Sequence, residues 1–107
     1  MEGRLRAALA ERPSVVLHRN RRHILNLASR HGIAGIRVFG SVASGLDNHD
    51  SDIDLLVTIS DHADPFAPID FTSELARLLG TPVDVVADHQ IGGDRLVEHA
   101  RETAIPL

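Results

Sequence analysis

Apolar residues recur at helical spacing in the first third of the chain. Between residues 15 and 31 most of them lie three or four positions apart, as on the buried face of a helix. They are Leu17, Ile24, Leu25, Leu27 and Ala28. Ser14 precedes this run as an N-cap and Gly32 follows it as a stop. The pattern predicts one amphipathic helix over residues 15–31, after a short helix over residues 2–11.

Three shorter segments have the β-branched or alternating character of strands. They cover residues 36–39, 52–59 and 82–87. In the middle segment Ile53, Leu55 and Val57 alternate with Asp52, Asp54 and Leu56. Because successive strand side chains point to opposite faces, this alternation reserves one sheet face for carboxylates.

Helical patterns separate and follow these strands. A brief helix is predicted over residues 42–44, and a longer one lies within 65–80, starting near Pro68. Its inward residues would be Ile69, Phe71, Leu75, Leu78 and Leu79. A last helix is predicted over residues 94–103. The order of elements predicts an α/β (α+β) fold, with a small mixed β-sheet of about three to four strands flanked by helices.

The length and composition fit one small globular domain. The chain has 107 residues, of which 43% are hydrophobic and 24% charged, so we expect a single domain over 1–107, with N-terminal helices in 1–31 and the core in 36–107. It contains no cysteine, as is usual in a reducing compartment. No segment resembles a signal peptide or a membrane span. We predict a cytoplasmic protein without membrane contact.

The charge pattern argues against stable nucleic-acid binding. The formal net charge is −4, which disfavours binding through release of counterions. Basic residues concentrate in 18–23, whereas acids gather in 47–54 and again in 84–94. The chain has three Phe and no Trp or Tyr, so it lacks the aromatic platform of single-strand binders.

The candidate chemistry lies between the first two strands. Gly40 and Ser41 end one strand, and Asp52 and Asp54 follow after ten residues on the next. Either half alone is most often a plain turn or surface charge. Together they place a close-approach turn beside two carboxylates about 6–7 Å apart on one sheet face. Two like charges at this spacing repel unless a cation lies between them, and hard oxygen ligands suit Mg²⁺.

Asp84 and Gly40 add to this candidate site. Asp84 lies within an apolar strand, where a carboxylate would be costly to desolvate without a partner such as a metal. The alternative is that Asp84 caps a bend or pairs with Arg37. At Gly40 the missing Cβ lets backbone amides approach a phosphate, and Ser41 adds a hydroxyl donor. Ser41 could equally cap the following helical turn.

The segment from Val38 to Gly45, read with Ser51-Asp52-Ile53-Asp54-Leu55, resembles the DNA polymerase β-type nucleotidyltransferases, and within them the minimal members. The resemblance implies that Asp52, Asp54 and Asp84 ligate two Mg²⁺ ions. It also implies that Asp84 helps to deprotonate the attacking hydroxyl and that Gly40 and Ser41 hold the β- and γ-phosphates of ATP. Metal-assisted transfer of this kind depends on positioning and charge stabilisation.

The same resemblance implies a partner. Minimal members are typically encoded beside a HEPN-domain ribonuclease toxin, and as antitoxins they transfer AMP from ATP to a tyrosine of it. One departure is Ser44, where the minimal members commonly carry Arg. Two alternatives therefore stay open: a non-catalytic antitoxin that inhibits its partner by direct binding, and a nucleotidyltransferase acting on a small molecule or an RNA 3′ end.

Overall fold

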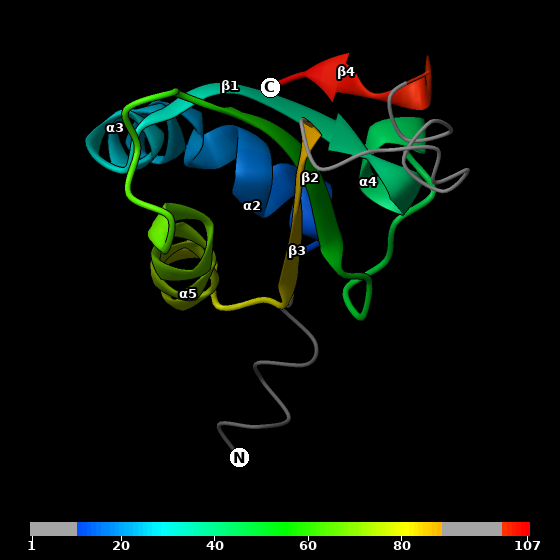
Figure 1. Cartoon of the computed structure of the whole chain (residues 1–107). Coiled ribbons are helices and arrows are strands. Elements are labelled where there is room, and N and C mark those ends of the chain that lie inside the picture. The colour runs from blue at the N-terminus through cyan, green and yellow to red at the C-terminus, as the bar shows by residue number, and fades with distance from the viewer. Residues whose placement is uncertain (1–10, 89–101) are drawn as a thin grey trace.

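A four-stranded mixed sheet forms the centre of the molecule. The computed structural model describes residues 11–88 and 102–107, and the helices predicted over 2–11 and 94–103 lie largely outside these ranges. The strands are β1 (Ile33–Phe39), β2 (Ile53–Ile59), β3 (Val83–Ala87) and β4 (Ile105–Pro106). Their order across the sheet is β3-β2-β1-β4 (Figure 1). The predicted mixed sheet of three to four strands is confirmed.

The strand pairing sets which residues lie side by side. β1 runs antiparallel to β2 and to β4, whereas β2 and β3 are parallel. β1 begins three residues earlier than the sequence pattern predicted, because Ile33 pairs with Ile59 before a bulge that ends at Gly35. β4 was not predicted, since two residues carry no readable periodicity. It pairs through Ile105 with Val38.

The single helix predicted over residues 15–31 is wrong. The structure has two helices, α2 (Pro13–Arg19) and α3 (Arg21–Arg30), divided at Asn20. The Asn20 side chain donates a hydrogen bond to the Val16 carbonyl at 2.8 Å. The Val16 carbonyl also accepts the helical bond from the Asn20 backbone amide at 3.2 Å, and the backbone leaves the helical region at Asn20, whose ψ is +12°. Ser14 is also not an N-cap, because it lies inside the first turn of α2.

Helix α5 (Ala67–Leu79) starts close to its predicted position and ends at Gly80, whose φ is +67°. Phe71, Leu75 and Leu79 face the core as predicted. Two residues predicted to point inward do not, since Ile69 is 65% exposed and Leu78 is 37% exposed. The apolar residues of α5 therefore cover more than the face that packs on the sheet.

Helices cover one face of the sheet. Helix α3 packs on β1 and α5 packs on β3, and the two helices also touch each other (Figure 1). Between them and the sheet lies a core whose fully buried side chains include Leu17, Ile24, Ile53, Leu55, Val57, Phe71 and Leu75. Within the described ranges, no helix is long and apolar enough to cross a membrane.

Candidate functional site

Strand register brings the candidate aspartates together at one end of the sheet. Asp54 pairs in register with Asp84 on the parallel neighbour β3 and with Phe39 on β1. Asp52 directly precedes β2, two residues before Asp54, so the two share a side of the chain. The Ile53 amide donates a hydrogen bond to the Pro82 carbonyl at 3.0 Å and ties the starts of β2 and β3 together. Three aspartates separated by up to 32 residues thus lie at the same end of the sheet, on the face opposite the helices.

Asp54 lies close enough to the other two carboxylates to be repelled by them. Asp54 is half-buried, whereas Asp52 and Asp84 are exposed. Burial raises the pKa of Asp54 above its ordinary value of 3.8, and the neighbouring charges of Asp84 and Asp52 raise it further. A carboxylate crowded in this way gains from any cation that enters between the three groups.

Asp84 differs from expectation in its surroundings. The sequence predicted a carboxylate desolvated within an apolar strand, but the side chain is exposed, so burial does not by itself demand a partner. The alternative pairing with Arg37 is not realised either. Arg37 instead donates to Asp88, with Nη2 and Oδ2 2.9 Å apart. Asp84 thus stays on the open face, beside Asp54.

Gly40 lies directly against Asp54. It begins the short helix α4 (Gly40–Ser44), where its φ is +72°. A Cβ at this position would come within 2.3 Å of Asp54 Oδ2. Both the left-handed backbone and the close approach therefore require glycine. Ser41, in the first turn of α4, lies next to this contact, so the predicted turn and the predicted carboxylates do meet.

Ser44 lies at the other end of α4. Its hydroxyl donates to the Ser41 carbonyl at 3.1 Å, and the helix ends at Gly45 with a φ of +78°. The Ser44 side chain thus stabilises the last turn of α4. It offers no positive charge to a phosphate.

A clamp that sequence reasoning missed holds the segment after α4. The Arg12 guanidinium donates to the carbonyls of Gly45 and Asp47, at 2.8 and 2.9 Å, and to Asp47 Oδ1 at 2.6 Å. Asp47 Oδ2 accepts from the Ser14 amide at 2.9 Å and so caps α2 from a distance. Burial alone would raise the pKa of Asp47, but the hydrogen bonds from Ser14 and Arg12 outweigh it and hold that pKa below its ordinary value. The clamp fixes the chain between Gly40 and the aspartates.

We expect Asp47→Ala to lower the free energy of unfolding by about 2–3 kcal/mol, because it removes an N-cap and leaves the Arg12 donors without their carboxylate. Chemical denaturation measures the loss. Asp50→Ala is the matched control, since Asp50 lies in the same loop with its side chain 86% exposed. Equal stabilities of the two variants would contradict the role of the clamp.

The donor chemistry of the site fits a hard divalent cation. All three side chains offer carboxylate oxygens, which Mg²⁺ prefers. As they stand, the side chains of the described residues do not converge into a group of three His, Asp or Glu ligands. Mutual repulsion keeps like charges apart, so we expect a cation to draw these carboxylates together.

Asp54→Asn is expected to raise the melting temperature at neutral pH by roughly 2–5 °C, because it removes a partly desolvated, repelled charge. The raised pKa means that folded Asp54 binds its proton more tightly than unfolded Asp54. The loss of folding stability caused by the ionised Asp54 carboxylate is therefore absent below pH 3.8. It develops as pH rises through the folded-state pKa. Thermal melts from acid to neutral pH measure the difference, which should shrink when Mg²⁺ is added.

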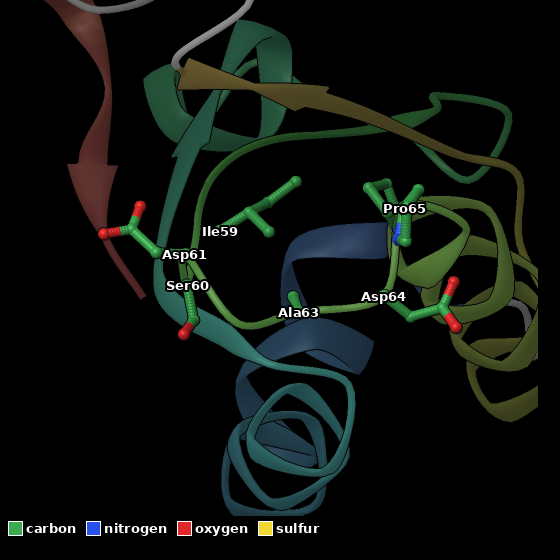
Figure 2. Close-up of a pocket in the computed structure, with 7 residues that line it drawn as sticks. Ile59, Ser60, Asp61, Ala63, Asp64 and Pro65 are labelled. Atoms are coloured by element: carbon green, nitrogen blue, oxygen red, sulfur yellow. The ribbon is translucent and has the colours of Figure 1, made fainter.

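A cavity of about 390 Å³ lies at the far end of β2, away from Asp54 (Figure 2). It is lined by Ile59, Ser60, Asp61, Ala63, Asp64, Pro65 and Pro68. Figure 2 shows the carboxylates of Asp61 and Asp64 pointing away from it on opposite sides. Asp64 Oδ1 accepts from the Phe66 amide at 2.8 Å, so it supports the turn into α5. The cavity brings no charged group toward the three aspartates.

Known proteins share both the sequence and the fold. Residues 22–106 match the family described as Polymerase beta, Nucleotidyltransferase. A protein of Methanocaldococcus jannaschii named "Putative protein adenylyltransferase MJ0435" is 30% identical over 83 residues, which cover 75% of this chain and 89% of that protein.

Solved structures agree with this match. A "putative minimal nucleotidyltransferase" is 38% identical, with a TM-score of 0.75 over 88% of this chain and 95% of that one. A toxin-antitoxin structure with AMP-PNP is 26% identical, with a TM-score of 0.68 over 81% and 71%. Residues 22–106, which match the family, contain the sheet, α4 and all three aspartates. The chain belongs to the polymerase β nucleotidyltransferase family.

Proposed function

We propose that this protein is a Mg²⁺-dependent protein adenylyltransferase that acts as an antitoxin. The observation that carries the proposal is the register of Asp54 with Asp84, with Asp52 two residues away and Gly40 directly against Asp54. Family membership implies a nucleotide substrate and, typically, a divalent metal.

Each residue has a part in this proposal. Asp52, Asp54 and Asp84 would hold two Mg²⁺ ions, which when bound would stabilise the charge that develops during transfer. Exposed Asp84 is accessible to an incoming hydroxyl and would accept its proton. Gly40 and Ser41 would bind the β- and γ-phosphates of ATP through backbone amides and the hydroxyl. The nucleotidyl group is AMP and pyrophosphate leaves.

The acceptor is proposed to be a partner protein. One relative is named as an adenylyltransferase of proteins, and a structural relative is a toxin-antitoxin assembly with AMP-PNP. The resemblance to minimal members adds the identity of the partner, a HEPN ribonuclease toxin, and of the acceptor, a tyrosine hydroxyl. Modifying that tyrosine would neutralise the toxin.

The test uses the purified protein, its HEPN-domain neighbour, labelled ATP and Mg²⁺. We expect the label to appear on the neighbour, and peptide mass spectrometry to find AMP on tyrosine. Chelation of Mg²⁺ should abolish the transfer. If both proteins are folded and no AMP is transferred, the proposal fails.

A second candidate is inhibition by binding alone. The observation that favours it is Ser44, whose hydroxyl is engaged by the Ser41 carbonyl and supplies no cation for a triphosphate. Asp52→Ala combined with Asp54→Ala separates the two functions. A double variant that still protects cells from the toxin would show that transfer is dispensable.

A further inference from the structure

A groove lies between the outer surfaces of α3 and α5. These two helices touch each other on the side of the sheet away from the aspartates (Figure 1). The groove has a volume of about 310 Å³. It is lined by His23, Leu27, Arg30, Glu74, Arg77 and Leu78. A molecule bound in this α3–α5 groove would therefore leave the candidate site open.

Helical spacing places bases along the rim of the α3–α5 groove and leucines at its floor. On α3, His23, Leu27 and Arg30 follow one another at four- and three-residue spacing, so they share one face. Leu27 is 6% exposed, whereas His23 and Arg30 are exposed. On α5, exposed Arg77 stands beside Leu78, which is 37% exposed. The groove thus combines an apolar floor with a basic rim.

The α3–α5 groove lies on the basic side of an acidic chain. The formal net charge is −4, yet no Asp or Glu occurs from residue 12 to residue 46, a range that includes α2 and α3. Glu74 is the one acid among the residues that line the groove, and its Oε2 lies 3.3 Å from His31 Nε2. The charges along the groove therefore favour an anionic occupant.

The leucines decide which kind of anion fits. Nucleic acid binds through phosphate contacts and base stacking, and the lining of the α3–α5 groove offers no Phe, Tyr or Trp. A small inorganic anion would leave the leucines exposed to water. A peptide segment can satisfy both parts of the groove. Its carboxylates can pair with Arg30 and Arg77, while an apolar side chain between them packs on the two leucines.

We propose that the α3–α5 groove docks an acidic segment of a partner protein, with carboxylates against Arg30 and Arg77 and an apolar side chain on Leu27 and Leu78. This docking does not depend on the transfer reaction, because the groove and the three aspartates lie on opposite sides of the sheet. It would hold a partner on this protein without blocking the face where the partner is proposed to be modified.

Fluorescence anisotropy with a labelled synthetic peptide of repeated Glu-Glu-Leu tests the docking. We expect binding that weakens as salt is added, because charge pairs contribute to it. Arg30→Glu and Arg77→Glu should each raise the dissociation constant by about tenfold or more, since each sets like charges together. Leu78→Ser should raise it by about fivefold, because apolar contact is lost.

Arg22→Glu is the matched control for these variants. It makes the same charge reversal on α3, at an exposed residue that is not part of the groove lining, and should change the dissociation constant by no more than about twofold. Glu74→Gln removes the acid of the α3–α5 groove and should strengthen binding by about threefold. Circular dichroism checks that each variant folds.

Three results would overturn the proposal. The first is that the Glu-Glu-Leu peptide fails to bind, or binds no better than a Gln-Gln-Leu or a Glu-Glu-Ser peptide of the same length. The second is equal weakening by Arg22→Glu and Arg30→Glu, which would assign the binding to the diffuse positive charge of the helices. The third is a single-stranded RNA that displaces the peptide and itself loses binding in Arg30→Glu and Arg77→Glu, which would assign the groove to nucleic acid.

Discussion

Replacing Asp54 by Asn is expected to lower the rate of AMP transfer by at least about 1,000-fold, the scale of losing a preorganised electrostatic contact to the reacting group. Asp54 is the central carboxylate of the three, in register with Asp84 and two residues from Asp52. Asn keeps the shape of the side chain but removes the charge that would hold the metal. Radiolabel transfer at saturating ATP measures the rate.

Stability separates this loss from misfolding. The variant is expected to melt at a higher temperature than the unaltered protein, so a lower rate cannot be attributed to unfolding. Asp61→Asn makes the same chemical change at an exposed position at the far end of β2 and should retain full activity. Near-normal transfer by the Asp54 variant would remove this carboxylate from the proposed mechanism.

Gly40→Ala should reduce both stability and transfer. The substitution forces alanine to a φ of +72° and sets its Cβ 2.3 Å from Asp54 Oδ2, so the carboxylate must move. The backbone cost is about 1–2 kcal/mol, and the displacement of Asp54 adds to it. We expect a loss in the free energy of unfolding of about 2–3 kcal/mol, together with transfer reduced at least about 100-fold.

Gly45→Ala is the matched control, because Gly45 has a φ of +78° with no atom within 4 Å of the added Cβ. It carries the same backbone cost without the contact to Asp54. Denaturation and transfer assays on both variants isolate the effect of the carboxylate. Equal activity in the two would mean that the close approach of Gly40 to Asp54 has no role in transfer.

Local patterns gave correct expectations for β2 and for the ends of two helices. The alternation along residues 52–59 predicted β2 and the buried positions of Ile53, Leu55 and Val57. Glycine predicted the ends of α3 and α5, because Gly32 and Gly80 take a positive φ. The segment that joins Gly40 to Asp54 was likewise recognised from residue type and spacing.

The prediction of one helix over residues 15–31 failed at a single side chain. Asn20 fits a helical pattern as a polar surface residue, and nothing in the spacing shows that its side chain bonds to the Val16 carbonyl and that α2 stops there. The inward positions of Ile69 and Leu78 failed for another reason. Hydrophobic character alone does not distinguish a residue that faces the core from one that faces outward.

The sequence by itself determined β2, β3, the end of β1, the glycine turns and the identity of the three candidate carboxylates, because strand alternation and backbone conformation depend on near neighbours. Tertiary structure alone decided how these parts are held. Arg12 donates a hydrogen bond to Asp47, 35 residues away in the sequence, and Arg37 donates one to Asp88, 51 residues away. No periodic pattern in the sequence identifies such pairs, because any arginine of the chain could in principle pair with any of its aspartates or glutamates. Only the folded sheet brings the chosen partners within reach.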